Sequence, residues 1–67
     1  MGKSLDKQFG QFLRRQRGQQ SYAVFAKRLG ISASTLFRLE TAEQSATLGK
    51  LEDILKRLKA GISDVFQ

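Results

Sequence analysis

The sequence of 67 residues contains no cysteine, no histidine and no proline, and these absences exclude several kinds of protein. Without cysteine there are no disulfides, and without cysteine or histidine the usual zinc sites are excluded. A chain of this length has room for one small core, which must be stabilised by apolar packing alone. We therefore expect a single domain over residues 1–67.

Long apolar runs and residues suited to catalysis are also missing. No apolar run approaches the roughly 20 residues that span a bilayer, and the N-terminus lacks the apolar core of a secretory signal. We expect a cytoplasmic protein without membrane association. The side chains best suited to proton transfer near neutral pH are absent, and the six carboxylates show no paired arrangement. We therefore expect no enzymatic activity and no metal, cofactor or small-molecule ligand.

The apolar residues recur at helical spacing, and alternating Val/Ile/Thr segments are lacking, so the sequence predicts an all-α fold. We expect helices over residues 4–17, 21–29, 32–41, 47–59 and 62–66. The expected N-caps are Ser4, Ser21, Ser32 and Thr47, and the expected helix breaks are Gly18, Gly30 and Gly61.

Residues 21–40, SYAVFAKRLGISASTLFRLE, have the spacing of a helix-turn-helix. Ala26 offers little bulk where two short helices must approach each other. Gly30 can adopt the left-handed backbone that ends a helix, and Ser32 can cap the next one. The helix over 32–41 would place Leu36, Leu39 and Glu40 on one side and Ser34, Arg38 and Thr41 on the other, so the polar side is the candidate DNA-reading surface.

The net charge of +6 is concentrated in the part of the chain that contains this motif. Residues 1–40 hold eight of the twelve basic side chains and two of the six acidic ones, whereas residues 41–67 hold four of each sign. This distribution is expected of a surface that faces a polyanion, although a solvated basic surface without a specific partner would look the same.

Four side chains of the helix over 32–41 are candidates for contact with DNA bases. Arg38 can bind the O6 and N7 atoms of guanine, or else meets only phosphate or solvent. Ser34 can bond a base edge or a phosphate, and Ala33 can contact a thymine methyl group. Phe37 and Val24 are apolar where the fold would leave them outside the core. Phe37 could contact thymine methyl groups or a partner protein.

Residues 9–66 resemble the lambda-repressor-like helix-turn-helix family, the Cro/XRE type of transcriptional regulator. The resemblance is carried by LRRQRG at 13–18, FAKRLGISASTLFRLE at 25–40, TLGKLEDILKRL at 47–58 and ISDVF at 62–66. It implies a compact five-helix domain that binds double-stranded operator DNA with its third helix in the major groove. It also implies a weak homodimer on a palindromic operator. The chain departs from the family at Tyr22, where glutamine is common, at Ala42, where glycine is usual, and at Ala46, where proline is frequent.

The resemblance, together with the anion affinity of helix N-termini, also suggests residues that contact phosphate. These candidates are Gln20, Ser21, Tyr22, Ser32, Thr35, Thr41, Gln44 and Ser45. Glu40 lies on the inner side of its helix, where a lone carboxylate would be costly, so it needs a cationic partner. In the family an arginine late in the first helix pairs with this glutamate, and the matching residue is Arg15.

The alternative is that the same fold serves as a protein-interaction module of the antitoxin or anti-repressor type. In that hypothesis the exposed Phe37 and Val24 would face a partner protein. The small side chains of Ala33 and Ser34 favour it slightly, because they offer few direct contacts to bases.

Overall fold

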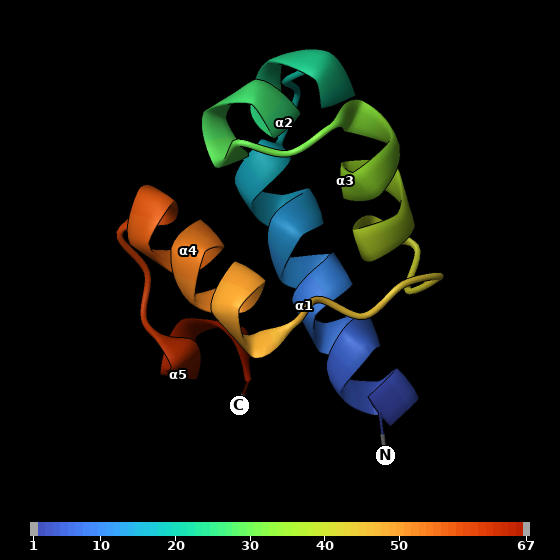
Figure 1. Cartoon of the computed structure of the whole chain (residues 1–67), viewed down its shortest axis with the longest axis vertical. Coiled ribbons are helices and arrows are strands. Elements are labelled where there is room, and N and C mark those ends of the chain that lie inside the picture. The colour runs from blue at the N-terminus through green and yellow to red at the C-terminus, as the bar shows by residue number, and fades with distance from the viewer. Residues whose placement is uncertain (1, 67) are drawn as a thin grey trace.

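The computed structural model describes residues 2–66, and side chains from Ser4 onward, as five helices joined by short loops (Figure 1). The helices are α1 (Gly2–Arg17), α2 (Tyr22–Leu29), α3 (Ala33–Glu40), α4 (Leu48–Leu58) and α5 (Ile62–Val65). This confirms the predicted all-α fold, with α2 and α3 forming the helix-turn-helix. The first and last residues of the expected domain, 1 and 67, lie outside the described residues.

Hydroxyl side chains begin three of the helices as predicted. Ser21, Ser32 and Thr47 each accept a hydrogen bond from a backbone amide three residues later, at 3.1, 3.0 and 3.1 Å. The prediction for Ser4 was wrong, because α1 begins at Gly2 and places Ser4 inside the helix. Gly61 does not end α4 either. That helix stops at Leu58, Lys59 takes the left-handed backbone after it, and Gly61 precedes α5.

The core lies where α1, α2 and α3 meet, and buried side chains of α4 and α5 complete it. Its largest fully buried side chains are Phe25, Leu13, Leu29, Leu36, Leu39 and Ile54. Val65 of α5 is also buried. In Figure 1, α1 runs through the middle of the molecule, with α3 on one side and α4 on the other.

Helices α1 and α3 are in close contact at Gly10. A Cβ atom at this position would lie 2.6 Å from the carbonyl oxygen of Glu40 and 2.7 Å from that of Leu39. Both oxygens belong to the backbone at the end of α3, which cannot move aside as a flexible side chain can. Gly10 therefore sets the distance between α1 and the helix that carries the candidate reading surface.

An apolar surface remains uncovered at the end of the molecule formed by the start of α1, the start of α4, and α5. Leu5, Leu48 and Ile62 are 51%, 84% and 54% exposed. The three side chains line a cavity of about 260 Å³. Among the described residues no helix has the length and apolarity to cross a membrane.

Candidate nucleic-acid interface

The turn between α2 and α3 is built by local hydrogen bonds that the sequence specifies. Gly30 has φ 72°, and its amide and that of Ile31 donate to the carbonyl oxygens of Lys27 and Ala26 at 3.2 and 3.0 Å. These bonds satisfy carbonyls at the end of α2, as expected of a glycine-capped helix. Since Ser32 then caps α3 directly, the two helices are held in a fixed relation. Ala26 is buried, in agreement with its predicted place at the helix approach.

Helix α3 has the two sides that the sequence predicted. Leu36, Leu39 and Glu40 are buried, and Thr35 is half-buried. The exposed side consists of Ala33, Ser34, Phe37, Arg38 and Thr41. Phe37 is 46% exposed and Val24 of α2 is 55% exposed, so both apolar residues lie outside the core as expected.

An open hollow of about 450 Å³ lies beside the exposed side of α3. It brings together all four predicted base-contacting residues and one predicted phosphate-contacting residue. The lining residues are Tyr22, Ala33, Ser34, Phe37, Arg38 and Glu43. Within the described part of the chain, Arg38 forms no salt bridge, so its guanidinium is available to an external acceptor.

The other predicted phosphate-contacting residues are spread over several elements, and most of their side chains already have partners. The Ser32 hydroxyl donates to Thr35 Oγ1 at 2.9 Å, and the Thr41 hydroxyl lies 2.8 Å from a carboxylate oxygen of Glu43. Ser45 donates to Asp6 of α1 at 2.6 Å. The side-chain oxygen of Gln20 accepts from Arg28 at 3.3 Å, whereas Gln44 is exposed. The structure therefore does not gather these residues into one cluster.

The prediction that Arg15 pairs with Glu40 was wrong, because the partner is Arg17. Arg17 donates from Nε to Glu40 Oε2 at 2.8 Å and from a terminal nitrogen to Oε1 at 3.2 Å. The Nε atom of Arg14 lies 3.7 Å from the same carboxylate. Positions 14 and 17 are three apart and share a helix side, whereas residue 15 is turned about 100° away from residue 14. Arg15 lines a separate small cavity with Gln8, Gln11 and Val65.

The bidentate contact fixes the charge state of Arg17. Its hydrogen bond to Glu40 raises the pKa of the guanidinium above the already high ordinary value for arginine, which outweighs the opposing effect of burial. Arg17 therefore stays cationic and neutralises the Glu40 carboxylate, whose side chain has no exposed surface. The third bond of Arg17 goes to the backbone oxygen of Gln20 at 3.0 Å and ties the end of α1 to the start of the motif.

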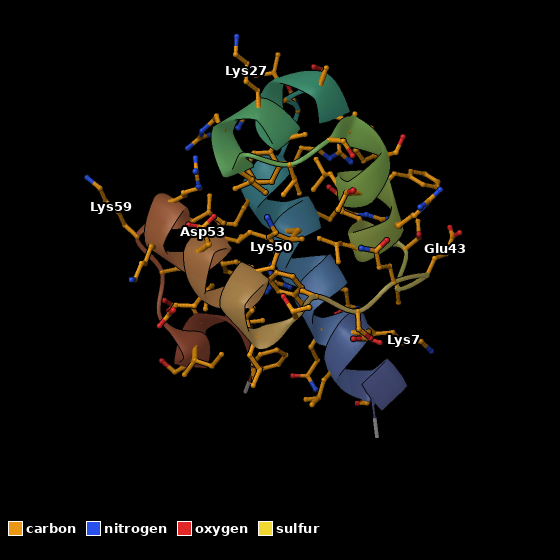
Figure 2. All side chains as sticks on the ribbon, viewed as in Figure 1. Lys7, Lys27, Glu43, Lys50, Asp53 and Lys59 are labelled. Carbon is orange, nitrogen blue, oxygen red and sulfur yellow. The ribbon has the colours of Figure 1, made fainter. Side chains whose placement is uncertain are left out.

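Three residues of this region were not identified from the sequence. Arg17 is one of three arginines near the end of α1, and spacing alone does not choose between them. Glu43 borders the hollow because the loop after α3 turns back, with its amide donating to Arg38 O at 2.9 Å. In Figure 2 its side chain points outward from this loop, and Lys27 points outward from α2. The contact of Gly10 with α3 could not be predicted, since a glycine inside a helical pattern does not reveal which other helix packs against it.

A family model described as "Helix-turn-helix domain" matches residues 8–65. The match covers all of α2, α3 and α4, together with most of α1. No curated protein and no solved structure matches the chain.

Proposed function

Because the chain belongs to the helix-turn-helix domain family, we propose that it is a sequence-specific DNA-binding transcriptional regulator of the Cro/XRE, lambda-repressor-like type. Helix α3 would lie in the major groove of double-stranded DNA, with the exposed side of Ala33–Glu40 against the bases. We place the protein in the cytoplasm and assign it no catalytic step. The observation that carries the proposal is the exposed side of α3, where Arg38 projects from a capped helix and has no salt-bridge partner among the described residues.

The electrostatics of the domain support this proposal. The surplus of basic side chains lies in residues 1–40, which include α3 and the turn before it. Contacts of lysine and arginine with phosphate release counterions, so binding should weaken steeply with salt. With about five such contacts, affinity should fall several hundredfold between 50 and 200 mM salt.

Fluorescence anisotropy with duplexes selected from a random pool tests the proposal. Arg38→Ala should weaken the preference at one base pair by about 1–3 kcal/mol. Lys27→Ala is the matched control, because Lys27 lies at the end of α2 and outside the hollow, so its loss should weaken all sequences alike. Binding that does not depend on salt, or no binding to any duplex at low salt, would contradict the proposal.

We further propose that two copies pair weakly on a palindromic operator. A short domain covers one half-site, and two-fold pairing extends the recognised sequence. The uncovered surface at Leu5, Leu48 and Ile62 supports a contact between copies, and the adjoining cavity is lined by both Glu52 and Lys56, which a two-fold axis could bring together. Leu48→Glu should abolish pairing in sedimentation experiments while leaving the monomer folded.

A second candidate is a protein-interaction module that uses the same fold. The exposure of Phe37 and Val24, at 46% and 55%, favours it. In that case a partner protein would protect Phe37 from solvent, and the domain would show no affinity for DNA even at low salt.

A further inference from the structure

The exposed side of α3 consists of two parallel rows of different chemistry. Residues four apart in a helix lie one above the other, so Ala33 and Phe37 form one row, and Ser34 and Arg38 form the next. The first row is apolar and the second is polar. Both rows line the same hollow, so a molecule bound there would meet the two rows side by side.

The aromatic ring in the apolar row is held from one side. The rings of Phe37 and Tyr22 meet edge to face, with centroids 5.7 Å apart and planes inclined at 69°. Such a geometry is favourable because the positive edge of one ring meets the negative face of the other. Tyr22 therefore limits the orientations of Phe37, while 46% of the Phe37 surface stays open to a ligand.

Tyr22 is itself fixed by the buried ion pair. The guanidinium carbon of Arg17 lies 4.1 Å from the centroid of the Tyr22 ring, a cation–π contact. Since Arg17 is bound to Glu40 at 2.8 Å, the contacts run from the inner side of α3 through Arg17 and Tyr22 to Phe37 on the outer side. The Phe37 ring is thus ordered before any ligand arrives.

We propose that the row of Ala33 and Phe37 selects a thymine methyl group next to the base pair contacted by Arg38, and that Tyr22 is a positioning residue for Phe37. In the major groove the edges of the bases present hydrogen-bond donors and acceptors, and the thymine C5 methyl group is the apolar exception. An apolar row beside a polar one matches a thymine beside a base that is read by hydrogen bonds. The inference rests on the proposed binding of DNA.

Replacement of thymine by deoxyuridine tests the inference, since it removes the methyl group and leaves the base-pairing edge unchanged. Duplexes selected by the protein are made with one thymine replaced at a time. The intact protein should lose about fourfold in affinity at the critical position, as expected for one methyl-sized apolar group. The ratio of the two affinities is measured within one protein, so it does not depend on the fraction of folded molecules.

Four variants separate the roles of the residues. Phe37→Ala should bind the thymine and deoxyuridine duplexes equally. Tyr22→Ala should lower the ratio although Phe37 is still present, whereas Tyr22→Phe, which keeps the ring, should retain it. Val24→Ala is the control, because Val24 is equally apolar and exposed but does not line the hollow.

The outcomes distinguish this inference from the function on which it rests. Salt-dependent, sequence-specific binding with equal affinity for thymine and deoxyuridine at every position would overturn the methyl contact and leave the proposed function intact. A ratio that Phe37→Ala leaves unchanged would also overturn it. If no duplex binds at low salt, the proposed function fails and the inference fails with it.

Discussion

Gly10→Ala adds a single methyl group where α1 is in close contact with the end of α3. The new Cβ would lie 2.6 and 2.7 Å from two backbone oxygens and 3.0 Å from the carbonyl carbon of Glu40. Real Cβ atoms do not approach this closely, so α3 must move away from α1. The displacement would affect both the stability of the core and the position of the reading surface.

The magnitude follows from two opposing effects. Alanine in a helix is favoured over glycine by about 1 kcal/mol. Forcing an extra methyl group into a packed contact costs about 1–3 kcal/mol, and we take the upper end, about 3 kcal/mol, because both neighbouring atoms are backbone oxygens. We expect Gly10→Ala to lower the free energy of unfolding by about 2 kcal/mol. For a domain of this size, about 10 °C would then be lost from the Tm.

Gly49→Ala is the matched control, because Gly49 also lies in a helix but has no atom within 4 Å of the added Cβ. It should raise the free energy of unfolding by about 0.4–1 kcal/mol. Thermal and urea denaturation followed by circular dichroism measure both variants. If Gly10→Ala proved as stable as Gly49→Ala, the proposed close contact between α1 and α3 would be refuted.

Further substitutions, and a measurement of pH dependence, test other parts of the structure. Arg17→Met should lower the Tm by several degrees because it leaves Glu40 buried without its main partner, whereas Arg15→Met should change it little; equal effects would contradict the observed pairing. Because the pKa of Arg17 is raised on folding, the stability that its positive charge contributes should be present at neutral pH and, as the pH rises, should be lost when the solution becomes strongly alkaline, which denaturation at several pH values above neutral can measure. Ala42→Gly should raise the free energy of unfolding by up to about 1 kcal/mol, since Ala42 holds φ 61°, and urea denaturation showing a loss would argue against that strain. Glu43→Gln should strengthen DNA binding about threefold at low salt, with the gain shrinking as salt rises, because it removes a negative charge beside the hollow; anisotropy would show an unchanged affinity if the charge has no influence.

The sequence predicts the helices well because their boundaries are decided locally. A hydroxyl that accepts from an amide three residues later, or a glycine that takes a positive φ, requires no knowledge of the rest of the molecule. The prediction failed at the end of α4, where a residue other than glycine takes the positive φ. Lys59 ends α4 in a left-handed backbone that a lysine would not suggest, and the last helical residue, Leu58, lies three residues before Gly61.

The sequence predicted which residues of α3 form the candidate site better than it predicted the contacts between side chains. Helical spacing separates the exposed Arg38 from the buried Leu39, because each turn of a helix repeats the same geometry. The partner of Glu40 depends on how α1 is rotated against α3, and one step along α1 turns a side chain by about 100°. Periodicity within one helix carries no information on that rotation, so the choice between Arg15 and Arg17 required the structure.

The bonds that hold α3 in place all come from its inner side and its two ends, while Ala33, Ser34 and Arg38 form no side-chain hydrogen bond within the described part of the chain. If α3 binds DNA as proposed, recognition and folding are assigned to different side chains of the same eight-residue helix. Substitutions at these three positions could therefore redirect the domain to another target sequence with little loss of stability, which makes it a suitable scaffold for designing new specificities.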